Sequence, residues 1–451
     1  MPNSSDNENA RTIRETLGLP HLFRSLGFAV RGVSLAAAFV GLCATLFYGG
    51  CVLDPIAGML GAPSLSPVAV DQFTTANATG SAYDEPIGEF GIFEVFRRYE
   101  QRALLDLLSA PIPGALQGTP HYGATGVVNR LAFGLVEVGH GVWWLIRCHF
   151  LYFLFLAAGT LLIWSFCGGA ICRTTAVQFA RDEHITIARA FDFAREHLTS
   201  GFFLAPCLPL MLMAVFALIL ILCGVGLRIP VFGDLLGGLG FFLTILLGFG
   251  ITLLGVGTVA GGSLFWPGVA IERCDWFDAF NNGLQYPLAR PWKALWYAFV
   301  TAAFGAFCWF FVRWFAYFVL AITRGLVAFG TSPWGFWNRG TVDAPISKLA
   351  MLWPMSGPNA MYHWPNWSGM SWYECVSGFL VGLCILAVLG LMWSFLITFY
   401  FSGSTVIYFL LRRDVDGTDL QDLRGDDLEP STAASISPVS PHDESTNEQS
   451  A

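Results

Sequence analysis

The stretch ARDEHITIARAFDFAREH (residues 180–197) is the most charged segment inside an otherwise apolar chain. It holds two Glu–His pairs, Glu183–His184 and Glu196–His197, and carboxylate beside imidazole suggests a metal site or acid–base chemistry. The two glutamates are thirteen residues apart, which on one helix separates them by roughly 140°. The helical metal-binding spacings Glu-x-x-His and His-Glu-x-x-His do not occur within this stretch. We therefore expect no metal ligands and no catalytic residues here.

The hydrophobic period of the same stretch predicts an amphipathic helix. Thr186 is a good N-cap residue, and Arg189, Asp192 and Arg195 form one charged face after it. Apolar residues recur on the other side with helical spacing, at Ile187, Ala190, Phe191, Ala194 and Leu198. Such a helix is typical of a membrane surface or a docking site. Arg189 and Arg195 are therefore candidate contacts for a partner.

The composition around this helix is that of a multi-pass membrane protein. Of 451 residues, 55% are hydrophobic and 12% are charged, against about 25% charged in soluble domains. The mean hydropathy is +0.57. The 24 basic residues form no patch large enough for nucleic acid, so we expect no nucleic-acid partner. No GxxxxGK[ST] phosphate loop is present, which argues against an ATP-driven motor within this chain.

Six segments are long and apolar enough to cross a bilayer, which needs about 20 residues. They lie at about 33–53, 145–171, 201–227, 235–259, 296–322 and 376–411. Pro206 and Pro209 are expected to kink the third, because proline removes a helix hydrogen bond. The sequence thus predicts an all-α integral membrane helical bundle of about six transmembrane helices, with amphipathic interfacial helices.

The distribution of arginine predicts the orientation. Arginines gather before the first span, between the second and third, between the fourth and fifth, and after the sixth. Both termini are therefore expected in the cytoplasm, and we expect no cleavable signal peptide at the N-terminus. The expected organisation is a disordered N-terminus (1–17), a six-span membrane domain (18–411) with outer loops 54–142 and 324–374, and an acidic disordered tail (412–451).

The two outer loops carry distinct patterns. Residues 90–108 place phenylalanine and leucine near helical spacing, which predicts an amphipathic helix lying on the membrane or on the bundle. The second loop is rich in tryptophan, which indicates either an interfacial belt or an aromatic platform for sugar or lipid. Cys51, Cys148 and Cys375 fall near the outer face, where a disulfide is one possibility.

The opening helix has a partial copy further along the chain. The segment DWFDAFNNGLQY, which starts at Asp275, aligns with TIARAFDFAREH, which starts at Thr186, and shares an Ala–Phe pair with it. Asp275 is a second good N-cap residue, and a Gly–Gly pair ends the span before each copy. We therefore expect a unit of span, inner amphipathic helix and span, used twice in the same orientation.

Arg313 is the clearest charge inside a predicted span. An intramembrane charge is a functional-site hypothesis by default. Because Arg313 lies in the outer half of its helix beside Trp309 and Trp314, its guanidinium could also extend outward to the interface. Both interpretations, a pore or ligand contact and a structural snorkelling residue, are consistent with the sequence.

The segment STVIYFLLRRDVDGTDLQDL (residues 404–423) resembles the C-terminal signature of a family of uncharacterised bacterial multi-pass inner-membrane proteins. The matching residues are Ile407, Tyr408, Leu410, Leu411, Arg412, Asp414, Asp416 and Thr418, and residues 168–195 resemble the first inner loop of that family. More distantly, the repeated unit is similar to the membrane domain of some glycerophosphodiester phosphodiesterases, without their catalytic domain. The resemblance implies a location in the bacterial inner membrane and carries no activity.

These observations favour a non-enzymatic component that organises lipid or docks a partner. The lipid bilayer is one expected partner, and a protein at the inner helices or the tail is a possible second. The alternative is a transporter or permease-like subunit for a small solute or lipid, with a path near Arg313 and the Pro206/Pro209 kink. An intramembrane enzyme is the least favoured class, and we expect no cofactor and no metal.

Overall fold

The computed structural model describes residues 19–62, 64–65, 69–70, 90–109, 127–228, 232–331, 338–341, 344–354, 361–362, 365, 367, 370–420 and 423. The described chain is all-α apart from one two-stranded hairpin and one isolated bridge. Six of its helices are long and apolar enough to cross a membrane, which confirms the predicted fold class. The protein is a multi-pass helical membrane protein.

The six long helices form three hairpins. The first pairs α3 (Gly32–Leu46), the start of a continuous helical segment that ends at Met59, with α8 (Phe150–Arg181). The second pairs α10 (Leu204–Gly226) with α11 (Phe232–Gly261), and the third pairs α14 (Pro291–Thr331) with α16 (Trp372–Asp416). A short helix precedes each hairpin: α2 (Leu19–Ala29), α9 (Ile187–Glu196) and α13 (Trp276–Ala289). The sequence predicted a unit of span, inner helix and span, used twice; in the structure a short helix precedes each of three hairpins instead. We call each short helix, together with the hairpin that follows it, a unit.

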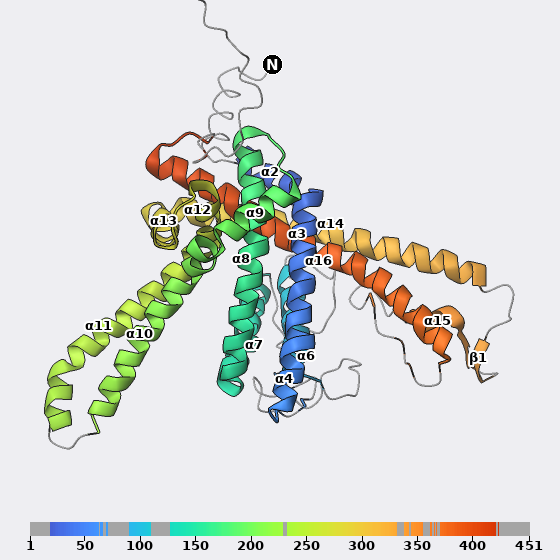
Figure 1. Ribbon diagram of the computed structural model, residues 1–451, viewed down its shortest axis with the longest axis horizontal. Coiled ribbons are helices and arrows are strands. Elements are labelled where there is room, and N and C mark those ends of the chain that lie inside the picture. The colour runs from blue at the N-terminus through green and yellow to red at the C-terminus, as the bar shows by residue number, and fades with distance from the viewer. Residues whose placement is uncertain are drawn as a thin grey trace, which may run out of the picture.

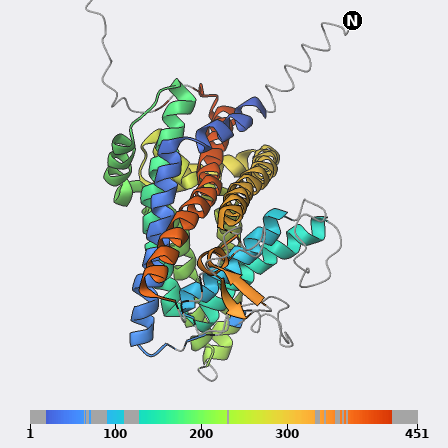
Figure 2. The ribbon, with the colours of Figure 1, turned by 90° about the vertical axis from the view of Figure 1, so that its right-hand side faces the viewer.

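The three units close into a ring. Helix α9 packs on α8 of the unit before it, and α13 packs on α10 and α11 of the unit before it. Helix α2, which begins the chain's first unit, packs on α16 and α14 of the last unit. We call the end of the molecule where α2, α9, α12 (Phe265–Glu272) and α13 gather the junction end. The hairpins diverge from this end (Figure 1), while α3 and α16 run side by side (Figure 2).

Helices α8, α12 and α16 meet in the core of the junction end. Small residues allow the approach: a Cβ added at Gly168 of α8 would collide with the ring of Phe401 on α16. Between the same two helices the hydroxyls of Thr175 and Ser402 lie 3.1 Å apart. Close packing with interhelical hydroxyl contacts is the usual way in which membrane helices associate.

The helix that returns to the junction end in each unit stops at a left-handed residue. Asp182 follows α8 with φ 55°, Arg273 follows α12 with φ 51°, and Gly417 follows α16 with φ 68°. A left-handed residue at this position ends a helix by turning its N–H back onto the last turn. Glycine adopts this φ without strain, whereas Asp182 and Arg273 adopt it at a steric cost.

Helices α9 and α13 begin where the sequence predicts, after the extended residues Thr186 and Asp275. The predicted side-chain caps are wrong, because neither residue makes a capping hydrogen bond. The predicted apolar stripe of α9 is also partly wrong. Ala190 and Ala194 are buried as expected, but Phe193 is buried too and Ile187 is 43% exposed.

Two of the helices are much longer than predicted. Helix α14 has 41 residues and α16 has 45, so they extend about 62 Å and about 68 Å at 1.5 Å per residue. A bilayer core is about 30 Å thick, so these helices must tilt strongly or extend beyond it. Helix α16 continues to Asp416, past the predicted end of the span at residue 411. The predicted disordered segments, the N-terminus before residue 19 and the tail beyond residue 423, lie outside the described residues.

The long outer loop contains two further helices, α6 (Ile92–Ser109) and α7 (Val127–Cys148), which pack on each other. The predicted amphipathic helix 90–108 corresponds to α6, and it lies on the protein. Asp54, at the start of α4 (Asp54–Met59), accepts hydrogen bonds from the N–H of Phe93 at 2.9 Å and the hydroxyl of Tyr152 at 2.6 Å.

In the second outer loop, β1 (Asn338–Thr341) pairs antiparallel with β2 (Ala344–Ser347), followed by α15 (Lys348–Leu352).

Candidate functional site

A buried carboxylate, Glu272, lies at the centre of the junction end. It is the last residue of α12 and 9% exposed. Its Oε1 accepts a hydrogen bond from Tyr408 Oη of α16 at 2.7 Å, and its Oε2 accepts one from Asn282 Nδ2 of α13 at 2.9 Å. Arg412 Nε of α16 lies 3.4 Å from Oε1. Because each carboxylate oxygen already accepts a hydrogen bond, Glu272 is suited to hold helices together and poorly placed to act as a general base.

A second set of contacts joins α13 and α14 to the end of α16. Tyr286 donates to Asp416 at 2.6 Å and lies 3.4 Å from Glu272 Oε1. Burial, and then the hydrogen bond to Asp416, raises the pKa of Tyr286, so its hydroxyl stays protonated and donating. Asp414 accepts from Tyr297 at 2.9 Å and pairs with Lys293 at 3.0 Å. Glu272 and these aspartates were not among the predicted site residues.

Two arginines, Arg173 and Arg273, lie against the ring of Phe193. Arg173 of α8 is 7% exposed and donates from Nη1 to the carbonyl oxygen of Ala270 at 2.8 Å. Its guanidinium carbon lies 4.5 Å from the ring centroid of Phe193, and that of Arg273 lies 5.3 Å from the same centroid. The positive charges of Arg273 and Arg181 both act on Arg173.

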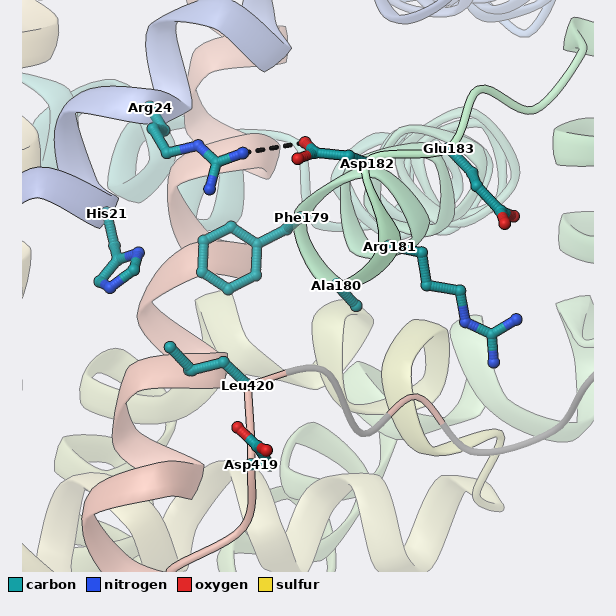
Figure 3. Close-up of a pocket in the computed structure, with 9 residues that line it drawn as sticks. All are labelled: His21, Arg24, Phe179, Ala180, Arg181, Asp182, Glu183, Asp419 and Leu420. Carbon is teal, nitrogen blue, oxygen red and sulfur yellow. Dashed lines mark hydrogen bonds and ion pairs between the residues drawn. The ribbon is translucent and has the colours of Figure 1, made fainter.

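A cavity of 630 Å³ opens at the junction end, between α2, the end of α8 and the segment after α16. Phe179, Ala180 and Leu420 supply its apolar lining, and a pair between Arg24 and Asp182, 2.9 Å apart, lies at its edge (Figure 3). The remaining lining residues are ionisable: His21, Arg181, Glu183 and Asp419. Figure 3 shows Arg181 and Glu183 extending away from Phe179 and Leu420. The cavity volume is within the usual range for small-ligand sites, about 300–1,000 Å³.

Arg313 of α14 is buried, at 7% exposure. The negative charge of Asp106, on α6, acts on it. Helix α6 packs on α14, so an acidic group on the outer-loop helix reaches an arginine in a span. The spans themselves place no acidic residue near the middle of the bilayer as a partner for Arg313. The signal was present in the sequence, since Asp106 interrupts an otherwise apolar run of leucines.

Arg189 and Arg195 of α9 are both exposed. Asp192 and Glu196 are exposed on the same helix, so its outward surface carries both signs of charge. His197 packs against Phe193, with 4.4 Å between ring centroids, and His184 lies beside Arg31. The structure therefore gives each histidine of the two Glu–His pairs a separate neighbour and does not bring the pairs together.

The chain contains one Glu-x-x-His spacing, from Glu137 to His140 on α7. Within the described residues, no group of three His, Cys, Asp or Glu side chains is arranged to hold a metal ion. All eleven cysteines are free thiols, so Cys51, Cys148 and Cys375 form no disulfide in this structure. Burial, and then the nearby carboxylates, raises the pKa of Cys274 to about 12, which disfavours a nucleophilic thiolate there.

The tryptophans of the second outer loop divide between two environments. Trp353 is buried at 5% exposure, whereas Trp367 and Trp372 are 40% and 79% exposed. Trp334, Trp337 and Trp364 lie outside the described residues. Comparison with known protein families, curated proteins and solved structures finds no match to this chain.

Proposed function

We propose that this multi-pass membrane protein is a non-enzymatic organising component of the bacterial inner membrane, which contacts lipid through its hairpins and a protein partner through its junction end. The observation that carries this proposal is the closed ring of three units, in which each short helix packs on the hairpin of a neighbouring unit. The contacts of Glu272, Asp414 and Asp416 reinforce one boundary of that ring. A ring fixed in this way offers a stable surface on which a partner can dock.

The exposed face of α9 is the proposed docking surface. Ala190, Phe193 and Ala194 hold the helix down, while Arg189 and Arg195 project outward. Exposed charges at a protein interface chiefly set specificity and the rate of association. We therefore propose a partner whose surface also carries charges of both signs, with acidic groups opposite the two arginines.

The proposal includes an orientation in which the junction end and both termini face the cytoplasm. Its support is the gathering of arginines at that end, including Arg24, Arg31, Arg181 and Arg189, as the positive-inside rule requires. Cysteine labelling from outside intact cells tests this orientation. A single reporter cysteine at Glu196, in a chain whose native cysteines are replaced, should stay unlabelled until the membrane is permeabilised.

The docking proposal is tested by crosslinking in membranes, followed by identification of the captured protein. The double substitution Arg189→Glu and Arg195→Glu should abolish a crosslink that the unchanged chain makes. Arg290→Glu is the matched control, because Arg290 is exposed at the end of α13 and lies outside the proposed surface. Capture that is equally strong in all three proteins would refute docking on α9.

A transporter or permease-like subunit is the second candidate, and the buried position of Arg313 favours it. An arginine that is 7% exposed and influenced by Asp106 is the type of group that lines solute or proton paths. The test is solute uptake into vesicles containing the purified protein. Arg313→Gln should abolish uptake, whereas Arg324→Gln, on the same helix, should not. Absence of uptake by the unchanged protein across anionic, zwitterionic and lipid substrates would eliminate this candidate.

A further inference from the structure

Helix α7 is apolar on its exposed side, although it lies outside the six apolar spans of the described chain. The exposed side carries Leu135, Val136, Val142 and Trp143, which are 64%, 50%, 36% and 54% exposed. At about 100° per residue, these four side chains fall within roughly 120° of one another around the helix axis. They therefore form one continuous apolar surface, which we call the α7 stripe.

The opposite side of α7 is occupied by protein. Gly134 and Gly141 are buried on that side, against α6. A Cβ added at Gly134 would lie 3.0 Å from Cβ of Leu107, and one added at Gly141 would collide with the carboxylate of Glu100. Trp144, also away from the stripe, is 3% exposed. The contact with α6 is therefore already made, and it leaves the α7 stripe uncovered.

The ionisable residues in the middle of α7 turn away from the stripe. Glu137 and His140 are both half-buried. On the helix they lie roughly 160° and roughly 100° from the centre of the α7 stripe. A helix that packs on protein in water has the reverse arrangement, with apolar groups against the protein and polar groups outward. The exposed surface of α7 is therefore suited to an apolar solvent.

The α7 stripe ends close to the exposed side of a span. Helix α7 ends at Cys148 and α8 begins at Phe150, and His149 between them has a non-helical backbone (φ −137°, ψ 53°). Phe150 and Leu151, in the first turn of α8, are 58% and 70% exposed. Because α8 is one of the spans, exposed apolar side chains at its start face lipid. The C-terminal end of α7 therefore lies where the chain enters the membrane.

We propose that α7 is embedded in the bilayer leaflet opposite the junction end, with phospholipid acyl chains covering the α7 stripe. A helix with an exposed apolar face binds a bilayer in proportion to the apolar area that it buries there. Trp143 supplies a ring of the type that favours the headgroup zone, and the last turn adds Arg147, which is exposed. Helix α7 is then a further lipid contact besides the three hairpins, whichever side of the membrane the junction end faces.

The collision rates of a nitroxide spin label test this proposal, because oxygen concentrates among acyl chains and a polar nickel chelate stays in water. The full chain, with its native cysteines replaced, carries one reporter cysteine and is reconstituted into vesicles of phosphatidylcholine and phosphatidylglycerol. The reporters are Val136→Cys and Val142→Cys. Leu151→Cys is the lipid-facing control on α8, and Glu196→Cys is the water-facing control on α9. Both reporters should match Leu151→Cys, with an oxygen-to-nickel collision ratio several-fold above that of Glu196→Cys.

A second measurement keeps the native cysteines. A phospholipid with a photoactivatable diazirine on its acyl chain is incorporated into the vesicles, irradiated, and mapped after digestion with trypsin. Cleavage after Arg130 and Arg147 releases the peptide 131–147, which contains the whole α7 stripe, and cleavage after Arg189 and Arg195 releases the peptide 190–195 of α9. The first peptide should carry lipid, and the second should not.

Two collision patterns would overturn the proposal. Nickel rates at Val136 and Val142 as high as at Glu196 would show that water covers the stripe. Low rates with both oxygen and nickel would show that protein, such as a second copy of the chain, covers it. Absence of lipid on the peptide 131–147 would overturn the proposal as well, and this result decides alone if the chain without native cysteines does not fold.

Discussion

Removing the hydroxyl of Tyr408 tests whether Glu272 holds the ring together as a charged group. Tyr408 is fully buried, at 0% exposure, and donates to Glu272 at 2.7 Å. The change Tyr408→Phe keeps the aromatic side chain in place and removes only the hydrogen bond to Glu272. The carboxylate keeps Asn282 and Arg412 but loses its shortest contact.

The expected loss follows from the charge of the acceptor. A hydrogen bond to a charged group contributes about 1.5–3 kcal/mol, whereas a neutral one between membrane helices averages about 0.6 kcal/mol. We therefore expect Tyr408→Phe to lower the free energy of unfolding by about 1.5–3 kcal/mol. Tyr400→Phe is the control, because Tyr400 is on the same helix and 48% exposed, and it should change stability by less than about 0.5 kcal/mol.

Equilibrium unfolding in mixed micelles with increasing SDS measures both variants. A double-mutant cycle with Glu272→Gln then isolates the pair, and the cost of Tyr408→Phe should fall by about 1 kcal/mol once the acceptor is neutral. A loss below about 0.6 kcal/mol in the single variant would show that Glu272 is not a charged acceptor in the folded protein. An equal loss of unfolding free energy in Tyr400→Phe and Tyr408→Phe would refute a stabilising role for the hydrogen bond between Tyr408 and Glu272.

Two further predictions concern other parts of the molecule. Burial raises the pKa of Glu100 on α6 from its usual value of 4.5 to about 8. Between these two pH values the folded protein keeps the proton on Glu100, whereas the unfolded chain releases it. The free energy of unfolding should therefore fall as pH rises from about 4.5 to 8. In a thermal-shift series, Glu100→Gln should therefore be more stable than the unchanged chain at pH 8, by of order 1 kcal/mol after screening, with no gain at pH 4.5. Gly168→Ala should lower the free energy of unfolding by about 1–3 kcal/mol because its methyl group meets Phe401, while Gly248→Ala, which meets open space, should gain up to about 1 kcal/mol. Equal effects of the two glycine substitutions in SDS unfolding would contradict the packing of α8 on α16.

The membrane class and the six spans could be predicted because bilayer crossing depends on a local property, the hydropathy of about 20 consecutive residues. The starts of α9 and α13 were also predictable, since Thr186 and Asp275 each precede a helical pattern. The lengths of α14 and α16 were not. Hydropathy marks the apolar part of a helix, and the polar extension at Asp414 and Asp416 continues the helix through tertiary contacts.

The candidate site depended on contacts that no local pattern reveals. Glu272 and Tyr408 are 136 positions apart, and each occurs in a segment that looks unremarkable by itself. Arg313 could be singled out from the sequence, but its neighbour Asp106 lies in a loop helix more than two hundred residues away. Helical spacing alone could place Arg189 and Arg195 on the polar side of α9, where both are exposed, and their role as partner contacts stays a prediction.

The closure of the ring by α2 bears on the order of synthesis. Helix α2 is the first described helix to be made, and its packing surface lies on α16, the last. The hydrogen bond from Thr398 to the carbonyl of Ala29 joins residues 369 positions apart. At about 5–20 residues per second, roughly 20–70 seconds of translation separate the two. For that interval α2 has an apolar face without its final neighbour, so the ribosome, the insertion machinery or the bilayer surface must cover it until the last helix arrives.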